Sequence, residues 1–383
     1  MDRVLIAGVS TRAAAESAAR AGFAVTAIDA FGDLDQHASV RVVSLEGAFT
    51  ARAAAHAARP VNCDAVVYLA NFENHPAAIS ELAATRVLWG NPPEVIRRVR
   101  DPLILADALR RHGLAAPQVR LTPDSPSDMG ARFGPTDTTP WLVKPLASGG
   151  GQRIRRWPRG ETLTRSCYLQ ELIDGPPGSV VFVAAGGRAA VLGVSRQLVG
   201  EQTFGAAGYQ YCGNILADED AALERSAHAL ARAVTEEFGL VGLNGIDFIV
   251  RDGVPYAIEV NPRWCASMEL VERADDFGIL AAHAEACAAG RLPVLNPRRD
   301  SRREGLAAWG KAVVYARRDV AVGDTHPWLA NEDIRDIPHP GDHIRAGRPV
   351  CTVFATGRST EMCHEALADG AAKIYEQLDA WEH

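Results

Sequence analysis

The stretch GIDFIVRDGVPYAIEVNPR, residues 245–263, is the part of the chain that decides its fold. Two apolar runs with alternating polar positions flank the dipeptide Asp252-Gly253. An Asp-Gly pair between two such runs is a strong signal for a two-residue β-hairpin turn, because both residues tolerate the backbone conformation that the turn requires. The stretch therefore predicts two antiparallel strands, the second of which ends in Glu-Val-Asn-Pro-Arg.

Three polar side chains of this hairpin are expected to share one face. Glu259 and Asn261 are two residues apart, so strand alternation puts them on the same side. A turn at 252–253 pairs position 247 near position 258, which brings Asp247 beside Glu259 across the strands. Carboxylate and amide oxygens are the hard ligands that Mg²⁺ prefers, with Mn²⁺ as an alternative ion. The spacing predicts a metal site formed by Asp247, Glu259 and Asn261.

Arg263 follows the hairpin directly and can place a fixed positive charge at the same edge. The alternative interpretation is a solvated hairpin face whose acids pair with arginines, which is a common arrangement. A hairpin that ends in Glu-Val-Asn-Pro-Arg is an unusual way to build such a face, so the metal interpretation is favoured.

A second candidate site lies earlier in the chain, where a predicted strand ends at Lys144-Pro145 and leads into the glycine run Ser148–Gly151. A glycine run lets backbone N–H groups approach phosphate oxygens, and a nearby ammonium adds charge for the same anion. The spacing is not that of a Walker P-loop. An exposed glycine turn is the alternative. Only three of the 40 basic residues are lysines, which makes a lysine at this position more informative.

The first 95 residues alternate short apolar runs with alanine-rich segments. This pattern predicts a doubly wound parallel sheet. The loop after Gly8 lacks Gly-x-Gly-x-x-Gly, which argues against a dinucleotide cofactor. The loop Asn71–Asn74 follows a predicted strand, at the end of the sheet where such folds bind ligands. Glu73 is therefore a candidate substrate contact, with a role in shaping the loop as the alternative.

The predicted elements divide the chain into three parts. Residues 1–95 form the N-terminal domain, residues 96–300 hold the lysine, glycine and hairpin motifs, and residues 301–383 form a small α+β unit. The turn at residues 90–93 marks the first boundary and the polar stretch 296–304 the second.

Composition excludes several classes of protein. The apolar fraction of 47% and charged fraction of 23% are those of an ordinary globular protein, not of a disordered or fibrous one. A net charge of -7 leaves no chain-wide basic footprint for nucleic acid, and the longest apolar run is too short to cross a membrane. Seven scattered cysteines without a Cys-x-x-Cys pair predict reduced thiols and a cytoplasmic protein.

The order of these motifs resembles that of ATP-grasp enzymes, and most closely the biotin-carboxylase-like carboligase branch. Four motifs carry the resemblance over residues 1–300: the strand with Lys144 and its glycine loop, Tyr168–Gly175, Gly245–Phe248, and Glu259–Arg263. The resemblance implies a mixed α/β and α+β architecture. It consists of a doubly wound parallel-sheet N-terminal domain, an ATP-grasp fold with the nucleotide between its two subdomains, and a small C-terminal β-rich domain.

The resemblance also assigns roles to residues. Lys144 would contact the α- and β-phosphates of ATP, and Arg263 would face the reacting acyl phosphate. Mg²⁺ would be held by Asp247, Glu259 and Asn261. The nucleotide would be covered by the loop of Ser148, Gly149, Gly150 and Gly151 and would lie along the hinge of Gln170, Glu171, Leu172 and Ile173.

Two positions depart from the family pattern. Relatives place an acidic residue after the hinge glycine to hold the ribose hydroxyls, whereas this chain has Pro176-Pro177, and Asp174 is the nearest substitute. Relatives also have a lysine near the start of the grasp domain, where this chain has Arg100.

The resemblance implies an ATP- and Mg²⁺-dependent ligase that joins a small-molecule carboxylate to an amine through an acyl phosphate and releases ADP and phosphate. The alternatives are a carboxylase or kinase of the same superfamily and a nucleotide-binding sensor without activity. No nucleic acid or membrane partner is expected, and a homodimer, common in this family, is one option for its assembly.

Overall fold

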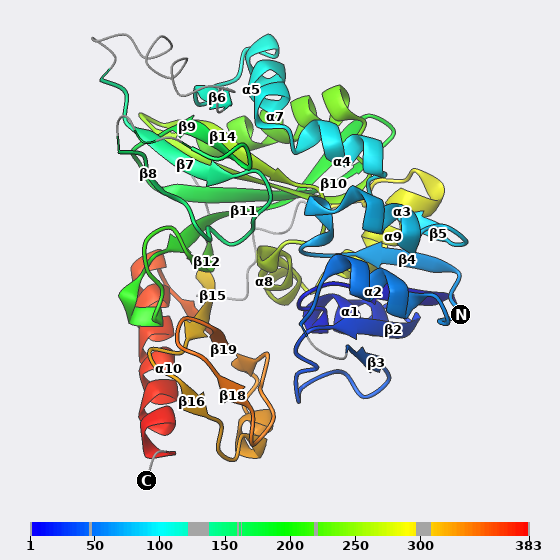
Figure 1. Ribbon diagram of the computed structural model, residues 1–383, viewed down its shortest axis with the longest axis vertical. Coiled ribbons are helices and arrows are strands. Elements are labelled where there is room, and N and C mark those ends of the chain that lie inside the picture. Colours follow the sequence, from blue (N-terminus) through cyan, green and yellow to red (C-terminus); the bar gives the residue numbers. More distant parts are fainter. Residues whose placement is uncertain are drawn as a thin grey trace.

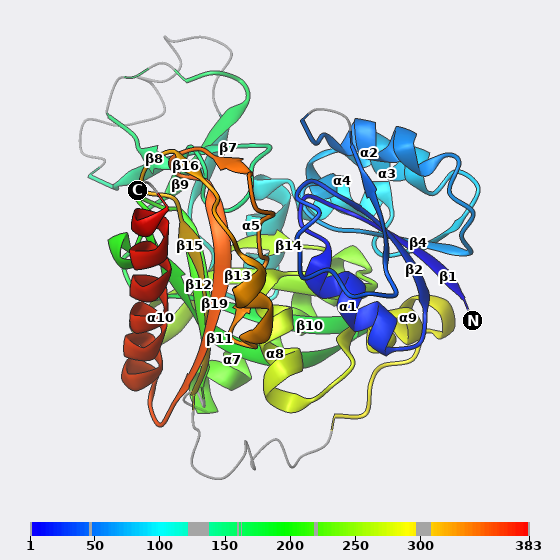
Figure 2. The same cartoon turned by 90° about the horizontal axis from the view of Figure 1, so that it is seen from below.

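The computed structural model describes residues 2–45, 48–121, 138–158, 161, 163–217, 221–295 and 308–381. Residues 122–137, and all of the linker predicted over residues 296–304, lie outside the described residues. Figures 1 and 2 show the arrangement of the elements from two directions.

The N-terminal part is a parallel sheet of strand order β3-β2-β1-β4-β5, as the alternating pattern predicts. Its strands are β1 (Arg3–Ala7), β2 (Ala24–Asp29), β3 (Arg41–Ser44), β4 (Ala65–Tyr68) and β5 (Val87–Trp89). The connecting segments are α1 (Arg12–Arg20), α2 (Ala51–Ala58), η1 (Phe72–Asn74) and α3 (Pro76–Leu82). The order reverses beside β1, so the sheet is doubly wound and offers its ligand-binding edge at the carboxyl ends of the strands.

Two helices, α4 (Pro93–Val99) and α5 (Pro102–Arg111), lead from this domain to a small antiparallel sheet of order β6-β9-β7-β8. The sheet contains β6 (Val119–Leu121), β7 (Trp141–Pro145), β8 (Arg155–Arg156) and β9 (Cys167–Glu171). It carries both Lys144, on β7, and the hinge segment, on and after β9.

The largest element is an eight-stranded antiparallel sheet of order β14-β13-β10-β11-β12-β15-β19-β17. Its strands are β10 (Pro177–Ala185), β11 (Arg188–Val199), β12 (Tyr211–Ala217), β13 (Gly242–Arg251), β14 (Val254–Asn261), β15 (Ala308–Tyr315), β17 (Ile334–Arg335) and β19 (Pro349–Gly357). Strands from the C-terminal part of the chain therefore continue the sheet that holds the metal-site hairpin.

Helices and short elements complete these layers (Figures 1 and 2). α10 (Thr360–Ala380), drawn in red, runs along β15 and β19. α7 (Ala221–Phe238) packs on β11 and β10. The remaining described elements are η2 (Gln202–Phe204), α8 (Ala266–Asp275), α9 (Ile279–Ala289), β16 (Val320–Ala321), η4 (His326–Ala330) and β18 (His343–Ile344).

The hairpin of β13 and β14 forms where the sequence predicts it, but its register differs by one residue. Asp247 pairs with Glu259, not with position 258, because a β-bulge follows Asp247 and Phe248 pairs with Ala257. A bulge places two residues of one strand opposite one of the other, so it shifts every pairing beyond it. The prediction counted residues from the turn with a regular register and missed this shift.

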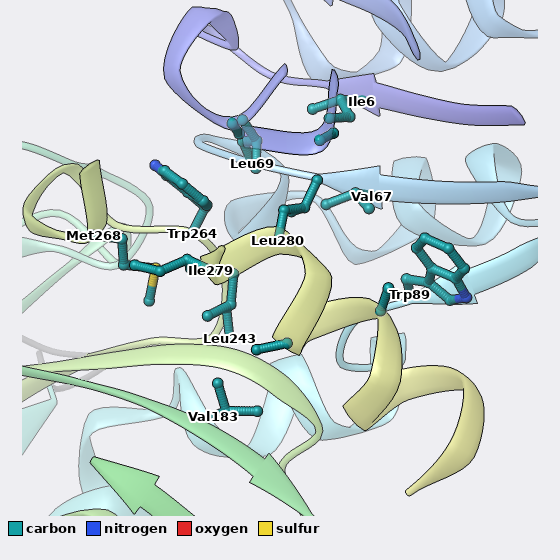
Figure 3. Packing of buried hydrophobic residues seen from close by; sticks show 14 of the residues in the cluster. Ile6, Val67, Leu69, Trp89, Val183, Leu243, Trp264, Met268, Ile279 and Leu280 are labelled. Carbon is teal, nitrogen blue, oxygen red and sulfur yellow. The ribbon is translucent and has the colours of Figure 1, made fainter. Parts of the chain in front are cut away.

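A hydrophobic core joins the N-terminal sheet to the large sheet. Val67 and Leu69, on or just after β4, lie above the helix α9, whose Leu280 faces them (Figure 3). Val183 of β10 and Leu243 of β13 lie below the same helix. All five side chains are almost fully buried, so α9 acts as a shared layer that holds the two sheets together.

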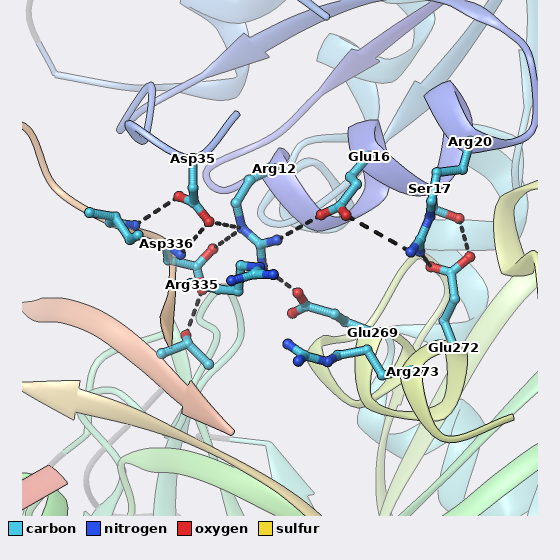
Figure 4. A network of polar contacts seen from close by, with 12 residues as sticks. Arg12, Glu16, Ser17, Arg20, Asp35, Glu269, Glu272, Arg273, Arg335 and Asp336 are labelled. Carbon is cyan, nitrogen blue, oxygen red and sulfur yellow. Dashed lines mark hydrogen bonds and ion pairs between the residues drawn. The ribbon is translucent and has the colours of Figure 1, made fainter. Parts of the chain in front are cut away.

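A buried ionic network joins the N-terminal domain to the C-terminal strands (Figure 4). Arg12, which has no exposed side-chain surface, donates through Nε to Asp336 Oδ1 at 2.7 Å and through Nη2 to Glu269. Lys311 of β15 donates to the other oxygen of Glu269 at 2.7 Å. Burial would raise the pKa of Glu269, but the charges of Arg12 and Lys311 outweigh it and hold that pKa far below its usual value.

Candidate active site

Two carboxylates define the site at the end of the hairpin. Asp247 on β13 and Glu259 on β14 are direct cross-strand partners, so their side chains leave the sheet on the same face. Asn261 lies two residues beyond Glu259 and donates through Nδ2 to Asp247 Oδ2 at 2.9 Å. The other oxygen of Asp247 accepts from Gln197 Nε2 at 2.8 Å. Each carboxylate oxygen has a second lone pair, so Asp247 can still bind a cation.

Cations approach the same carboxylates from two other elements. Lys144 reaches from β7 toward β14, with Nζ at 3.5 Å from the carbonyl oxygen of Ile258 and its side chain about 5% exposed. Arg100, between α4 and α5, donates to Glu259 Oε1 and to the carbonyl oxygen of Val260, the latter at 3.1 Å. The site therefore lies between the small sheet and the large sheet.

The charges around the two acids push their pKa values apart. Burial raises the pKa of Asp247, and the negative charge of Glu259 adds to it, so the value is about 6. Burial would also raise the pKa of Glu259, but Arg100 and Lys144 outweigh it and lower that pKa. Burial lowers the pKa of Lys144, yet Tyr168 and Glu259 more than compensate and raise it. Glu259 raises the proton affinity of Asp247, and such a pair of neighbouring carboxylates is a favourable position for a divalent cation.

No group of three or more His, Cys, Asp or Glu side chains among the described residues could hold a metal ion. A metal at Asp247 and Glu259 would complete its coordination with Asn261, phosphate oxygens and water. Mg²⁺ commonly uses one or two protein carboxylates together with substrate phosphates. The oxygen-only donor set therefore fits Mg²⁺ and its close substitute Mn²⁺.

The glycine loop Ser148–Gly151 is held from two sides. Asn74 Nδ2 of the N-terminal domain donates to the carbonyl oxygen of Ser148 at 3.3 Å. The backbone N–H of Tyr211 donates to the carbonyl oxygen of Gly150 at 3.1 Å. At Gly151, which has φ +75°, a Cβ would lie 1.7 Å from the carbonyl oxygen of Tyr209, so only glycine fits there. Neither contact was foreseen, because no local sequence signal links these segments.

The expected hinge forms the end of β9 and the residues after it. Gln170 is buried and Ile173 is buried, whereas Asp174 is exposed. The N–H groups of Glu171 and Leu172 donate to the carbonyl oxygens of Gln118 and Pro140, both at 2.8 Å. Those two N–H groups are therefore already used within the protein, and the Glu171 carboxylate accepts from Arg251 Nη1 at 3.1 Å.

Arg263 lies between the metal-site residues and the N-terminal domain. Its Nη2 is 2.7 Å from Glu73 Oε1 and 3.3 Å from Asn261 Oδ1. Burial lowers the pKa of Arg263, but the charge of Glu73 outweighs it and the net shift is upward. The structure thus brings Glu73 to the same site as Asp247, Glu259 and Lys144. Sequence reasoning placed the loop Asn71–Asn74 at the ligand-binding edge but did not single out Asn74, and it missed Gln197; both contact these groups only through the tertiary fold.

Three other polar residues, Asp29, Cys265 and His339, have ordinary structural roles. Asp29 accepts hydrogen bonds from the backbone N–H and the hydroxyl of Thr11. Its carboxylate therefore occupies the start of α1. Burial raises the pKa of Cys265 to about 12, so its thiol stays neutral. His339 contacts the carbonyl oxygen of Gly32 through Nε2 at 2.8 Å.

Among the described residues, every helix is too short or too polar to span a membrane.

Residues 99–267 match the family model of the ATP-grasp domain, which covers the glycine loop, the hinge and the hairpin. Solved structures with the same fold include L-amino acid ligase from Bacillus licheniformis, with TM-score 0.70 and 16% identity over 96% of each chain. The biotin carboxylase domain of 2-oxoglutarate carboxylase from Hydrogenobacter thermophilus, in complex with MgADP, ADP and bicarbonate, has TM-score 0.69 and 16% identity over 93% of this chain and 86% of that one.

Other matches cover only part of a longer protein. The chain spans 37% of Rhizobium etli pyruvate carboxylase, with TM-score 0.73 and 14% identity over 99% of this chain. An uncharacterized protein of Methanocaldococcus jannaschii is 26% identical over 123 residues, which are 32% of this chain and 28% of that protein. These matches and the architecture agree with the family resemblance of the sequence motifs. The chain contains an ATP-grasp domain and has the biotin-carboxylase-like fold of the ATP-grasp enzymes.

Proposed function

We propose that this protein is an ATP- and Mg²⁺-dependent ligase that joins a small-molecule carboxylate to an amine through an acyl phosphate and releases ADP and phosphate. The observation that carries the proposal is the convergence of Asp247, Glu259 and Asn261 with Lys144 and Arg263, which come from separate sheets. A site that only bound a nucleotide would not need a buried arginine beyond the metal-binding face.

The proposed chemistry follows from the charges of these groups. A carboxylate does not react with an amine in water, because hydroxide is a poor leaving group, whereas an acyl phosphate does. Mg²⁺ bound at Asp247, Glu259 and Asn261 would neutralise charge on the phosphates during transfer. Lys144 offsets charge on the phosphates from the other side, and Arg263 offsets the charge that develops on the acyl phosphate.

The glycine loop supplies the third requirement, which is the exclusion of water. An acyl phosphate that meets water is hydrolysed before an amine can attack. Ser148–Gly151 lies between Asn74 of the N-terminal domain and Tyr211 of the large sheet, so it can cover the phosphates while both domains hold its ends. The same arrangement would align the γ-phosphoryl group with the carboxylate acceptor.

A trapping assay tests this proposal. The protein would be incubated with ATP, Mg²⁺ and hydroxylamine, together with one carboxylate at a time from a panel of amino acids and dicarboxylic acids. Hydroxylamine converts an acyl phosphate to a stable hydroxamate. We expect one carboxylate to give hydroxamate and ADP in equal amounts. ADP release without hydroxamate would instead indicate a carboxylase or a kinase, and nucleotide binding without any ADP release would indicate a sensor.

A further inference from the structure

Three buried polar atoms at the candidate site, and a fourth in the loop that carries Glu73, have no hydrogen-bond partner among the described residues. Two are acceptors, Asn71 Oδ1 and Glu73 Oε2, and two are donors, Arg100 Nε and Arg263 Nε. Buried polar atoms in folded proteins are nearly always partnered, so a cluster of unpartnered ones marks a place where ligand groups or ordered water complete the site. The two acceptors come from one loop of the N-terminal domain, whereas the two donors belong to the other side of the site.

The loop that carries the acceptors is anchored at the reaction centre. It follows β4, at the carboxyl ends of the parallel strands. Asn74 accepts from Arg100 Nη2 at 3.2 Å and also donates to Ser148 of the glycine loop. The side chain of Glu73 is 1% exposed, and its Oε1 pairs with Arg263 Nη2 at a distance of 2.7 Å. Its Oε2 is therefore a desolvated carboxylate oxygen beside the arginine that faces the acyl phosphate.

Charge balance decides what kind of ligand group suits this oxygen. The carboxylates of Glu73, Asp247 and Glu259 are matched by the cations of Lys144, Arg100 and Arg263. Bound ATP carries more negative charge than one Mg²⁺ removes, so the loaded site becomes negative. A buried carboxylate with an unpaired oxygen then favours a cation that can donate hydrogen bonds, and an ammonium group has three N–H donors.

We propose that Glu73 and Asn71 form the subsite that binds the attacking amine as its ammonium ion, next to Arg263. This inference rests on the proposed function and adds to it the charge state of the second substrate and the residues that select it. Glu73 Oε2 and Asn71 Oδ1 accept hydrogen bonds from the ammonium group, while Glu73 Oε1 keeps Arg263 in place. The ammonium ion has no lone pair, so it transfers one proton to Glu73 Oε2 before its nitrogen attacks the acyl phosphate and displaces phosphate. Glu73 then selects the amine through Oε2, and through Oε1 it positions Arg263 at the acyl phosphate.

A binding experiment tests the subsite without knowledge of the natural substrates. The full-length protein, saturated with Mg²⁺ and a non-hydrolysable ATP analogue, would be titrated with methylammonium and ethylammonium chloride at constant ionic strength, with thermal unfolding as the readout. Tetramethylammonium, which has no N–H donor, serves as the control ion. We expect the primary ammonium ions to raise the unfolding temperature of the wild-type protein, and Glu73→Gln to weaken their apparent affinity at least tenfold.

Matched variants separate the subsite from general effects. Glu73→Asp keeps the charge and should retain part of the response. Glu81→Gln removes a carboxylate from the same domain that pairs with Arg59 on the surface, at 2.6 Å, and should behave as wild type. The proposal would be overturned if the primary ammonium ions raised the unfolding temperature of Glu73→Gln as much as that of the wild-type protein, or if tetramethylammonium had the same effect as they do. Glu73 Oε2 would then bind water, or Glu73 would have a purely structural role.

An activity experiment distinguishes the failure of this inference from that of the proposed function. Hydroxylamine is uncharged at neutral pH, so it does not need an ammonium subsite. With a carboxylate found by the trapping assay, Glu73→Gln should lower coupling to a charged primary amine at least tenfold more than it lowers hydroxamate formation. Equal losses in both reactions would overturn the subsite alone. Absence of nucleotide binding or of hydroxamate in the wild-type protein would overturn both proposals together.

Discussion

Asp247 and Glu259 stand directly opposite one another on β13 and β14, and the bulge after Asp247 sets this pairing. The two carboxylates therefore share a face of the sheet, and the charge of Glu259 raises the proton affinity of Asp247. Lys144 belongs to a different sheet, yet its charge acts on both acids. Lys144, which is far from the hairpin in sequence, thus forms one electrostatic unit with Asp247 and Glu259.

Glu259→Gln should mainly lower turnover. The substitution keeps the shape of the side chain but removes the charge that holds a metal and pairs with Arg100. We expect a decrease in ADP release of about 100-fold, the size of effect seen when one electrostatic contact to a transition state is lost. A Mg²⁺ titration of ADP release measures it, and normal turnover at ordinary Mg²⁺ would show that the metal assignment is wrong.

Metal binding should weaken in acid because of Asp247. Its pKa of about 6 lies above the usual value, so the carboxylate gains a proton as the pH falls through about 6. Protons and Mg²⁺ compete for the same oxygens, so the apparent Mg²⁺ affinity should fall by up to about tenfold for each pH unit below that value. Mg²⁺-dependent nucleotide binding, followed from about pH 8 to pH 5, measures this slope.

Asp247→Asn is the control for that pH dependence. It should bind Mg²⁺ weakly at every pH and should lose the slope near pH 6, because the titrating carboxyl is gone. A slope that persists in this variant would assign the titration to another group of the site.

Lys144→Ala should weaken nucleotide binding more than it lowers turnover at saturation. The ammonium lies between the two sheets, where little water screens it, and in the proposed function it would contact phosphate as a point charge. We expect the dissociation constant of the ATP analogue to rise about 10- to 100-fold, measured by calorimetry. Lys373→Ala, which changes an exposed lysine of α10, is the matched control and should bind as wild type.

Arg12→Ala should destabilise the whole protein. Removing Arg12 leaves Glu269 with Lys311 as its remaining cation and leaves Asp336 without its guanidinium. Loss of one partner from a buried ionic network costs about 3–5 kcal/mol, because a buried charge stays uncompensated. Urea unfolding measures the change. Arg20→Ala, which removes a half-exposed arginine from the same helix, should cost much less.

The three lysines illustrate how far composition could guide these predictions. The scarcity of lysine made Lys144 more informative, but it applied equally to Lys311 and Lys373. Lys144 and Lys311 are both buried, and Lys311 pairs with Glu269, whereas Lys373 is exposed on α10. Composition could not indicate their partners, because Glu269 is 42 residues from Lys311 and meets it only across α8 and β15.

Local chemistry in the sequence determined the elements of the site. The Asp-Gly turn, the alternation of β14 and the glycine run each act over a few residues, so one sequence was enough to predict the hairpin, the shared face of Glu259 and Asn261, and the loop after Lys144. The tertiary structure alone decided the register across the bulge, the pairing of Glu73 with Arg263, and the contacts of Asn74 and Tyr211 with the glycine loop. The ion pair and the loop contacts form only when the sheets and helices pack against one another and bury charged side chains together. The residues involved are far apart in sequence, so no local pattern connects them.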